Sequence, residues 1–275
     1  MRLYISADIE GIVGVVTRDH LAPEGFEYER ARVWYSDAIA AACEAAHEAG
    51  VSEVVVSDSH GNGESLLVER LPDYVQLIRS WPRPLMMMQG VEEGDYVGAM
   101  LIGYHTGASN PDGILAHTIS GSAFKEVRLN GQVVPEAGIS AATAAEYGVP
   151  VILASGDDHA MTEVASLIDG IVTVPVKWSY GTRSSRNLSP AAAHEAVRQG
   201  VRAALAAPEK AKLFELTPPI AIEIEFRHRM PAEYLSYLPN MERLDAYTIR
   251  FVGQSVTDVS KFIAFVTGYN MMLTL

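Results

Sequence analysis

The sequence predicts an α/β fold with a mostly parallel sheet and flanking helices. Three short apolar runs carry this prediction, over 3–7, 53–57 and 99–104. Each run is bounded by glycine or polar residues, a pattern typical of buried parallel strands. An alanine-rich helix is expected between the first two runs, over 27–49, which makes a βαβ unit with a right-handed crossover. Gly50 follows that helix, where a left-handed residue commonly ends one.

Shorter elements are expected along the next part of the chain. The segment 125–134 predicts a β-hairpin, because Asn130-Gly131 suits a type I′ turn between alternating residues. The other elements are predicted from apolar periodicity and from glycine and proline boundaries. They are a short helix over 65–71, extended segments over 75–78 and 84–88, helices over 136–147 and 159–168, and strands over 149–154 and 171–174.

The pattern changes near residue 185. The segment 178–188 is rich in glycine, serine, threonine and arginine, which indicates a linker or a functional loop. A helix over 190–206 follows, with Ser189 as its N-cap. The chain then continues with strands over 221–226 and 246–252 and a final helix over 255–273. We therefore expect two domains, a larger α/β domain over 1–184 and a smaller α+β domain over 185–275.

Composition narrows the class of protein. The formal net charge is −13, which argues against nucleic acid as a partner because phosphates require a basic surface. No apolar run is long enough to span a membrane, and the N-terminus has no secretory apolar segment. The single cysteine, Cys43, lies in a helical pattern and is expected to fill the core. These features predict a cytoplasmic protein.

The three apolar runs all lead into residues that can bind a metal. Asp8 and Glu10 follow the first run, His60 follows the second and His105 follows the third. Ligands of an open α/β sheet gather at the carboxyl ends of its strands, so these side chains are expected to meet. Two carboxylates that face together repel each other unless a proton or a cation lies between them. The sequence therefore predicts a metal-dependent enzyme.

Each of these residues also has a structural alternative. Asp8 is either a ligand or a helix cap, and Glu10 is either a ligand or a solvated charge at the strand end. Asp58 either orients an imidazole or caps the turn that follows it. His105 alone is more often a satisfied buried histidine. His117 lies beyond a flexible loop that returns toward His105, and either ligates or acts as a general acid or base. Glu136 alone is best explained as a first-turn carboxylate favoured by the helix dipole.

Other charged residues remain open in the same way. Asp157 and Asp158 either cap the next helix, which we favour, or contact a metal ligand or a substrate amine. Lys177, Arg183 and Arg186 either bind a substrate carboxylate or are solvated loop charges.

The chain resembles the DppA-type D-aminopeptidases, a family of dinuclear zinc peptidases, over residues 1 to about 225. Matching segments are Ser6-Ala7-Asp8-Ile9-Glu10-Gly11, Ser57-Asp58-Ser59-His60, Gly103-Tyr104-His105, Ala116-His117-Thr118, Glu136-Ala137-Gly138-Ile139-Ser140-Ala141, Gly156-Asp157-Asp158 and Leu188-Ser189-Pro190. The chain departs from the family pattern at two places. The loop between His105 and His117 is one residue longer, and Pro135 replaces a small residue.

The resemblance implies two zinc ions per subunit. Asp8 would bridge them, and the remaining ligands would be Glu10, His60, His105 and Glu136. His117 would be the catalytic residue that does not ligate. The resemblance also implies a homo-oligomer, a decamer of stacked pentamers with active sites facing a channel, to which 185–275 would contribute contacts.

We therefore expect an aminopeptidase that hydrolyses the N-terminal residue, a D-amino acid such as D-alanine, from short peptides or amides. A hydroxide between the metals would attack the scissile carbonyl, and His117 would stabilise the oxyanion or move the proton. D-configuration is implied by the resemblance alone. The alternatives are another dinuclear metal hydrolase, an amidase or a phosphoesterase, and a metal-binding oligomer without catalysis.

Overall fold

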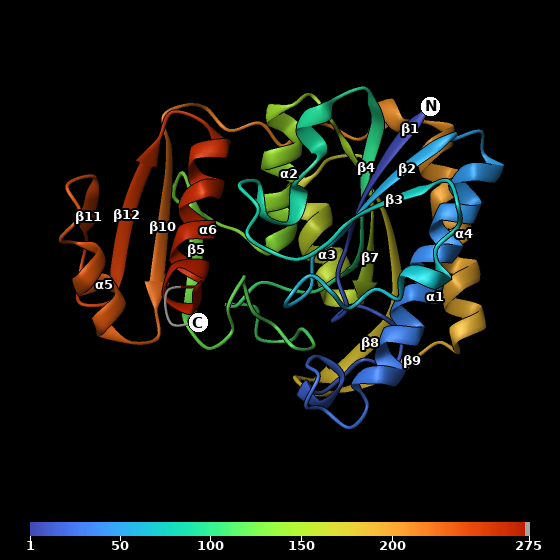
Figure 1. Cartoon of the computed structure of the whole chain (residues 1–275), viewed down its shortest axis with the longest axis horizontal. Helices are drawn as coiled ribbons and strands as arrows, with labels where there is room; N and C mark the ends of the chain where they lie inside the picture. The colour runs from blue at the N-terminus through green and yellow to red at the C-terminus, as the bar shows by residue number, and fades with distance from the viewer. Residues whose placement is uncertain (273–275) are drawn as a thin grey trace.

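The computed structural model describes residues 1–272, with side chains described up to residue 269. Two β-sheets organise the chain, and they lie side by side (Figure 1). The first sheet has seven strands in the order β3-β2-β1-β4-β7-β8-β9. Their bounds are β1 Arg2–Ala7, β2 Glu53–Asp58, β3 Val75–Ile78, β4 Tyr96–Tyr104, β7 Val151–Asp157, β8 Val172–Gly181 and β9 Ser184–Asn187.

The strand order of this sheet reverses at β1. β1 pairs with β2 on one side and with β4 on the other, and every neighbouring pair is parallel except β8 with β9. A reversal of this kind leaves a crevice at the carboxyl ends of the two central strands, since the connections leave in opposite directions. The predicted α/β class is confirmed, and so are the three strands expected from the apolar runs.

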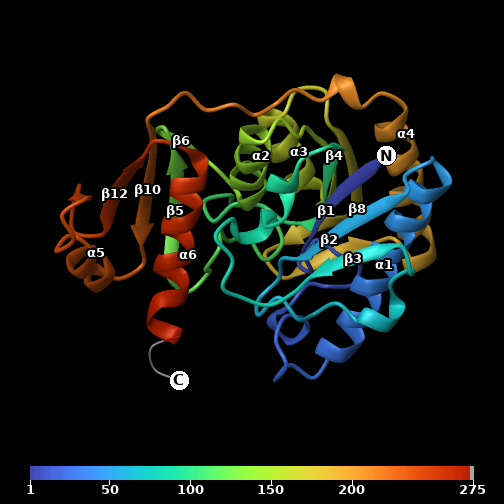
Figure 2. The same cartoon turned by 45° about the horizontal axis from the view of Figure 1, so that its top comes forward.

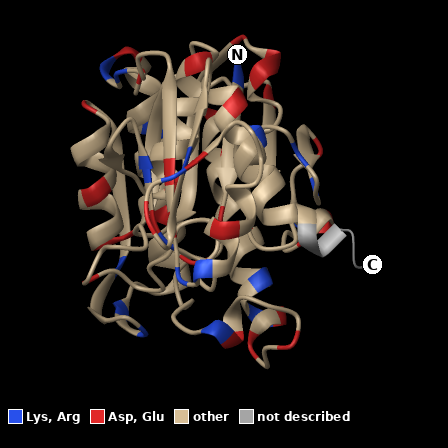
Figure 3. Cartoon of the chain, turned by 90° about the vertical axis from the view of Figure 1, so that its left-hand side faces the viewer, with Lys and Arg blue, Asp and Glu red and all other residues tan. Residues whose placement is uncertain are grey.

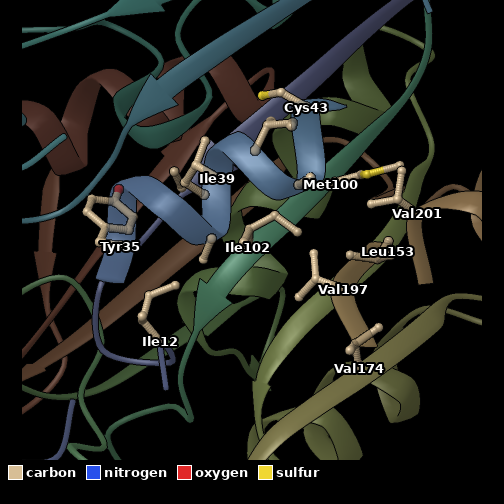
Figure 4. Packing of buried hydrophobic residues seen from close by; sticks show 14 of the residues in the cluster. Ile12, Tyr35, Ile39, Cys43, Met100, Ile102, Leu153, Val174, Val197 and Val201 are labelled. Atoms are coloured by element: carbon tan, nitrogen blue, oxygen red, sulfur yellow. The ribbon is translucent and has the colours of Figure 1, made fainter. Parts of the chain in front are cut away.

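Helices cover both faces of the first sheet (Figure 2). α1 (Tyr28–Glu48) and α4 (Pro190–Ala206) pack together on one face, and α2 (Glu136–Glu146) and α3 (Asp158–Leu167) lie on the other. Figure 4 shows the first of these layers, in which Ile39 and Cys43 of α1 belong to the same packed cluster as Val197 and Val201 of α4 and as Met100 and Leu153 of the sheet. Cys43 is fully buried, as expected of a core residue.

The second sheet has five strands in the order β11-β12-β10-β5-β6 and is antiparallel. α6 (Val256–Met272) packs against it, and α5 (Arg229–Leu235) lies at its outer end (Figure 1). Ile139 of α2 joins the core of this sheet, so α2 packs against both sheets. The strands are β5 Phe124–Leu129, β6 Gln132–Val133, β10 Ile220–Phe226, β11 Met241–Arg243 and β12 Thr248–Gly253.

The two sheets do not divide the chain at a single point. The expected hairpin is β5–β6, with Asn130 and Gly131 both at positive φ, and it pairs with β10 from the far end of the chain. In the other direction, α4 follows residue 184 but covers the first sheet. The division into domains at 184 and 185 therefore stays a prediction, and each sheet draws on both sides of it.

Several local expectations need correction. The segment 84–88 is not extended, because 86–88 form a 3-10 turn (Met86–Met88), and 65–71 contains only the 3-10 turn Val68–Arg70. The expected linker over 178–188 is the β8–β9 hairpin, since β8 runs past its partner β7 and turns back on itself. The final helix begins as expected, but position 273 of the prediction lies outside the described residues.

Acidic and basic residues are interspersed over the ribbon (Figure 3). Among residues 1–272, no helix is both long enough and apolar enough to cross a membrane. The N-cap of α4 is Ser189, whose hydroxyl oxygen accepts a hydrogen bond from the Ala192 amide at 3.3 Å, as predicted.

Candidate metal centre

The strand-end residues predicted from the sequence meet at the point where the sheet reverses. Asp8 comes directly after β1, His60 lies two residues beyond β2, and His105 comes directly after β4. Glu10 lies on the loop after β1. All four side chains are buried, between 1% and 8% exposed. Glu136 is the first residue of α2, which lies on the face of the sheet opposite α1, and its side chain joins the cluster and is also buried.

Asp8 lies at the centre of the cluster, with its two carboxylate oxygens facing different histidines. Its Oδ1 lies 3.3 Å from Nδ1 of His60, and its Oδ2 lies 3.4 Å from Nε2 of His105. Oδ1 also accepts a hydrogen bond from the Ile9 amide at 2.8 Å. A carboxylate with this arrangement can bind one cation through each oxygen.

One group forms on the β2 side of Asp8. Glu10 Oε2 lies 3.0 Å from His60 Nδ1, next to Asp8 Oδ1. The opposite ring nitrogen of His60, Nε2, donates to the carbonyl of Leu21 at 2.7 Å. Because a carbonyl can only accept, that bond keeps a proton on Nε2 and leaves Nδ1 as the nitrogen that faces the two carboxylates.

The second group forms on the β4 side. His105 Nε2 lies 3.4 Å from Glu136 Oε1 as well as from Asp8 Oδ2. His105 Nδ1 donates to the Thr106 carbonyl at 2.9 Å, so its Nε2 is the nitrogen available to the carboxylates. Glu136 Oε1 accepts from the Ile119 amide at 2.7 Å, which orients the carboxylate. Glu136 is both a first-turn residue of its helix and a member of the cluster.

His117 lies at the more open side of the cluster. Its ring stacks on that of His105, with centroids 4.1 Å apart and planes at 7°. Nδ1 donates to the Leu115 carbonyl at 2.8 Å, and Nε2 lies 3.6 Å from Glu136 Oε1 and 3.9 Å from Glu10 Oε1. Its side chain is 21% exposed, far more than that of His105. The loop between the two histidines therefore returns as predicted.

The charges in this cluster perturb one another strongly. Burial lowers the pKa of His60 and of His105, but the neighbouring carboxylates outweigh it and raise both pKa values well above the usual range. Burial raises the pKa of Asp8, but the adjacent imidazole rings of His105 and His60 outweigh this and lower it well below the usual range. The pKa of Glu136 is lowered as well, because attraction to His105 outweighs its burial.

The residues are suited to binding divalent metal. Three sets of donors each have their atoms within 4.8 Å of one another: Asp8, Glu10 and His60; Asp8, His105 and Glu136; and Glu10, His105 and His117. Asp8 Oδ2 and His105 Nε2 are buried and have no hydrogen-bond partner, although buried polar atoms are normally paired. Imidazole nitrogen and carboxylate oxygen are both zinc ligands.

Gly11 is required by a close backbone contact. A Cβ at this position would lie 2.2 Å from the Tyr104 carbonyl oxygen. The Gly11 amide donates to the Gly103 carbonyl at 2.7 Å. Glycine is therefore required because the loop after β1 packs directly on the end of β4, which brings the two strand ends together.

Asp58 and Asp157 have structural functions of the kind considered for them, whereas Asp158 does not cap the helix as we favoured. Asp58 is fully buried and accepts from the Leu66 amide and the Tyr35 hydroxyl, so it ties the loop after β2 to α1. Asp157 caps α3 by accepting from the amides of residues 159 and 160. Asp158 accepts from the Ser179 amide at 3.0 Å.

Lys177 was misjudged from the sequence. It is fully buried, and its ammonium group donates to the backbone carbonyls of Glu10, Ile12 and Val15. It is therefore neither a solvated charge nor a free cation for a substrate carboxylate. Burial lowers its pKa to about 8. Its position after the apolar alternation of 172–176 was the available signal. Arg183 is exposed at the tip of the β8–β9 hairpin.

The fold and the donor set together define the class of protein, an α/β protein with a buried centre suited to divalent metal at the switch point of its parallel sheet. The chain belongs to the peptidase M55 family of D-aminopeptidases, whose model it matches over residues 1–265. The family inferred from the sequence is thus confirmed, as is an enzyme of the aminopeptidase class. The match extends beyond residue 225, where we expected it to thin.

Two similar proteins agree with this assignment. A D-aminopeptidase of Bacillus subtilis (strain 168) is 31% identical over 274 residues, which are 98% of each chain. A solved structure, the Zn-dependent D-aminopeptidase DppA from Bacillus subtilis, a self-compartmentalizing protease, superposes with a TM-score of 0.93 at 29% identity and with 98% of each chain covered.

Proposed function

We propose that this protein is a zinc-dependent D-aminopeptidase that holds two zinc ions and removes an N-terminal D-amino acid from short peptides or amides. The observation that carries the proposal is the position of Asp8, which presents one oxygen to His60 and the other to His105. The similar Bacillus protein of known structure is described as zinc-dependent, which supports the choice of metal.

The proposed ligands divide into two sets that share Asp8. One ion would be held by Asp8, Glu10 and His60, and the other by Asp8, His105 and Glu136. When bound, zinc would act as a Lewis acid toward the scissile carbonyl and would lower the pKa of a bound water to about 7. The carbonyl contacts of His60 and His105 hold both rings in the tautomer that ligation requires.

The proposed catalytic residue is His117. Its Nε2 faces the cluster while Nδ1 is occupied by the Leu115 carbonyl. A protonated Nε2 would donate to the developing oxyanion, or would pass its proton to the leaving amine. Its stacking on His105 and its greater exposure suit a group that contacts substrate rather than one buried among ligands.

Substrate class and metal dependence are tested together. We expect hydrolysis of D-aminoacyl amides and short peptides, little hydrolysis of the L-isomers and none of a phosphodiester. Treatment with a chelator should abolish activity, and added zinc should restore it. Rates on this panel, measured before chelation, after it and after zinc addition, separate the alternatives. Preferred cleavage of the phosphodiester, or full activity in the metal-free protein, would rule out the proposed function.

We also propose that the protein assembles as a homo-oligomer, a decamer of stacked pentamers, through its C-terminal part. Exposed apolar side chains gather on α5 and the turn after it, where Met230, Tyr234 and Tyr237 are between 65% and 68% exposed. Apolar groups in such a patch are typical of an interaction surface. The similar Bacillus structure is described as self-compartmentalizing.

The mass of the protein in solution tests this assembly. Light scattering should give about ten times the 29.8 kDa of one chain. Replacing Tyr234 and Tyr237 together by serine should lower that mass, because the pair would no longer bury its rings against a second copy. The control is Tyr180→Ser, an exposed tyrosine on the β8–β9 hairpin. A monomeric wild-type protein would contradict the proposal.

A further inference from the structure

The loop after β1 is buried although it forms neither helix nor strand. Residues 9–13 and 15 are buried there, and the backbone carbonyls of such a segment need hydrogen-bond partners. Lys177 of β8 supplies them. Its Nζ donates to the carbonyl of Val15 at 2.6 Å, to that of Ile12 at 3.1 Å and to that of Glu10. All three donors of the ammonium group are therefore used within one loop.

One of these carbonyls belongs to Glu10 itself. The peptide group between Glu10 and Gly11 is held at both ends, by Lys177 at its carbonyl and by the Gly103 carbonyl at its amide. The side chain that leaves this fixed backbone is the one whose Oε2 lies 3.0 Å from His60. The same β8–β9 hairpin supplies Asn187, whose Oδ1 accepts from the Gly14 amide at 2.9 Å.

We propose that Lys177 is a positioning residue that fixes the backbone of Glu10 and so holds the Glu10 carboxylate in place for a metal ion. The inference depends on the proposed metal centre but assigns a function to a residue outside the ligand set. Burying an ammonium group is unfavourable unless every proton is paired, so its presence here requires a specific set of acceptors.

If Lys177 positions the loop, replacing it should weaken zinc binding. If Lys177 acts only through its charge, replacing it should strengthen zinc binding. Lys177 is a cation close to the carboxylates of Asp8 and Glu10, so removing its charge alone would favour binding of another cation. Removing its three hydrogen bonds would release the loop and weaken binding. The direction of the change in zinc affinity therefore distinguishes them.

The experiment is a zinc titration of metal-free K177M, read by competition with a chromophoric chelator. Methionine keeps the unbranched shape and removes all three donors. We expect one of the two zinc equivalents to bind about 10- to 100-fold more weakly than in wild type, as for other residues that orient a ligand. The matched control is Val201→Ala in α4. Val201 is fully buried, so this variant should also lose stability, but it leaves the loop after β1 unchanged.

Zinc affinity of K177M equal to that of the control, or higher than wild type, would overturn the proposal. Should K177M not fold, K177Q in the same titration decides, because its shorter amide reaches fewer of the three carbonyls and is expected to show the same loss in smaller degree. A wild-type protein that binds no zinc would instead count against the proposed function, and this result is separate from any effect of Lys177.

Discussion

Replacing Asp8 by asparagine should remove both zinc ions and reduce kcat/KM by about 10³-fold or more. An amide keeps the size of the side chain and one oxygen for the Ile9 amide, but it cannot present a charged oxygen to each of two cations. Metal catalysis contributes several kcal/mol to transition-state stabilisation, and each 1.36 kcal/mol is a factor of about ten in rate. Metal analysis of the dialysed protein and steady-state kinetics measure the two effects.

The matched control for this variant is Asp58→Asn. Asp58 is fully buried and ends the neighbouring strand, but its carboxylate contacts Tyr35 and Leu66 and not the cluster. Burial raises its pKa, so a neutral amide is tolerated more readily there than at a strongly charged position. The control should keep both zinc ions. An Asp8→Asn protein that retains two tightly bound ions would show that Asp8 does not bridge them.

Replacing His117 by alanine should leave the zinc content unchanged and lower kcat by about 10²- to 10⁴-fold, the usual size of a general acid–base contribution. His117 is the most exposed of the three histidines in the cluster, and the two ligand sets that share Asp8 are complete without it. KM should change less than kcat, because the lost interaction forms mainly in the transition state. Metal analysis and kinetics on a D-aminoacyl amide give both readouts.

The control here is His159→Ala, a half-exposed histidine in the first turn of α3 at the same end of the sheet. It should keep both zinc content and turnover. A different result for His117 would change its assignment. Loss of one zinc equivalent from His117→Ala would make it a ligand, in line with the set formed by Glu10, His105 and His117.

Three members of the cluster could be found from strand ends, and a fourth from its spacing to one of them. The runs before Asp8, His60 and His105 are short and apolar, and the ends of neighbouring parallel strands meet at one edge of a sheet. Glu10 follows from its spacing to Asp8. Glu136 could not be found in this way, because it lies outside the strands and has an ordinary local explanation, and only the resemblance to a family brought it into the predicted site. His117 was a candidate from the return of its loop toward His105, but only the resemblance chose between a ligand and a catalytic residue.

The errors in the prediction have one physical cause. Lys177 looked like a loop charge because its acceptors are carbonyls of the loop after β1, more than 160 residues earlier in the chain. The segment 178–188 looked like a linker because its polar composition hides an antiparallel pairing. The need for glycine at position 11 was not predicted, because its close contact is with β4. Each depends on a partner distant in sequence.

The sequence by itself determined the α/β class, the three strands of the apolar runs, the long helices and the acidic and imidazole groups at the strand ends, because these follow from local periodicity and chain geometry. Only the tertiary structure decided that the two oxygens of Asp8 face different histidines, that each ring is held by a backbone carbonyl, and that the β5–β6 hairpin joins the second sheet. Those facts depend on contacts between segments far apart in the chain, and such contacts form only when the whole core is packed.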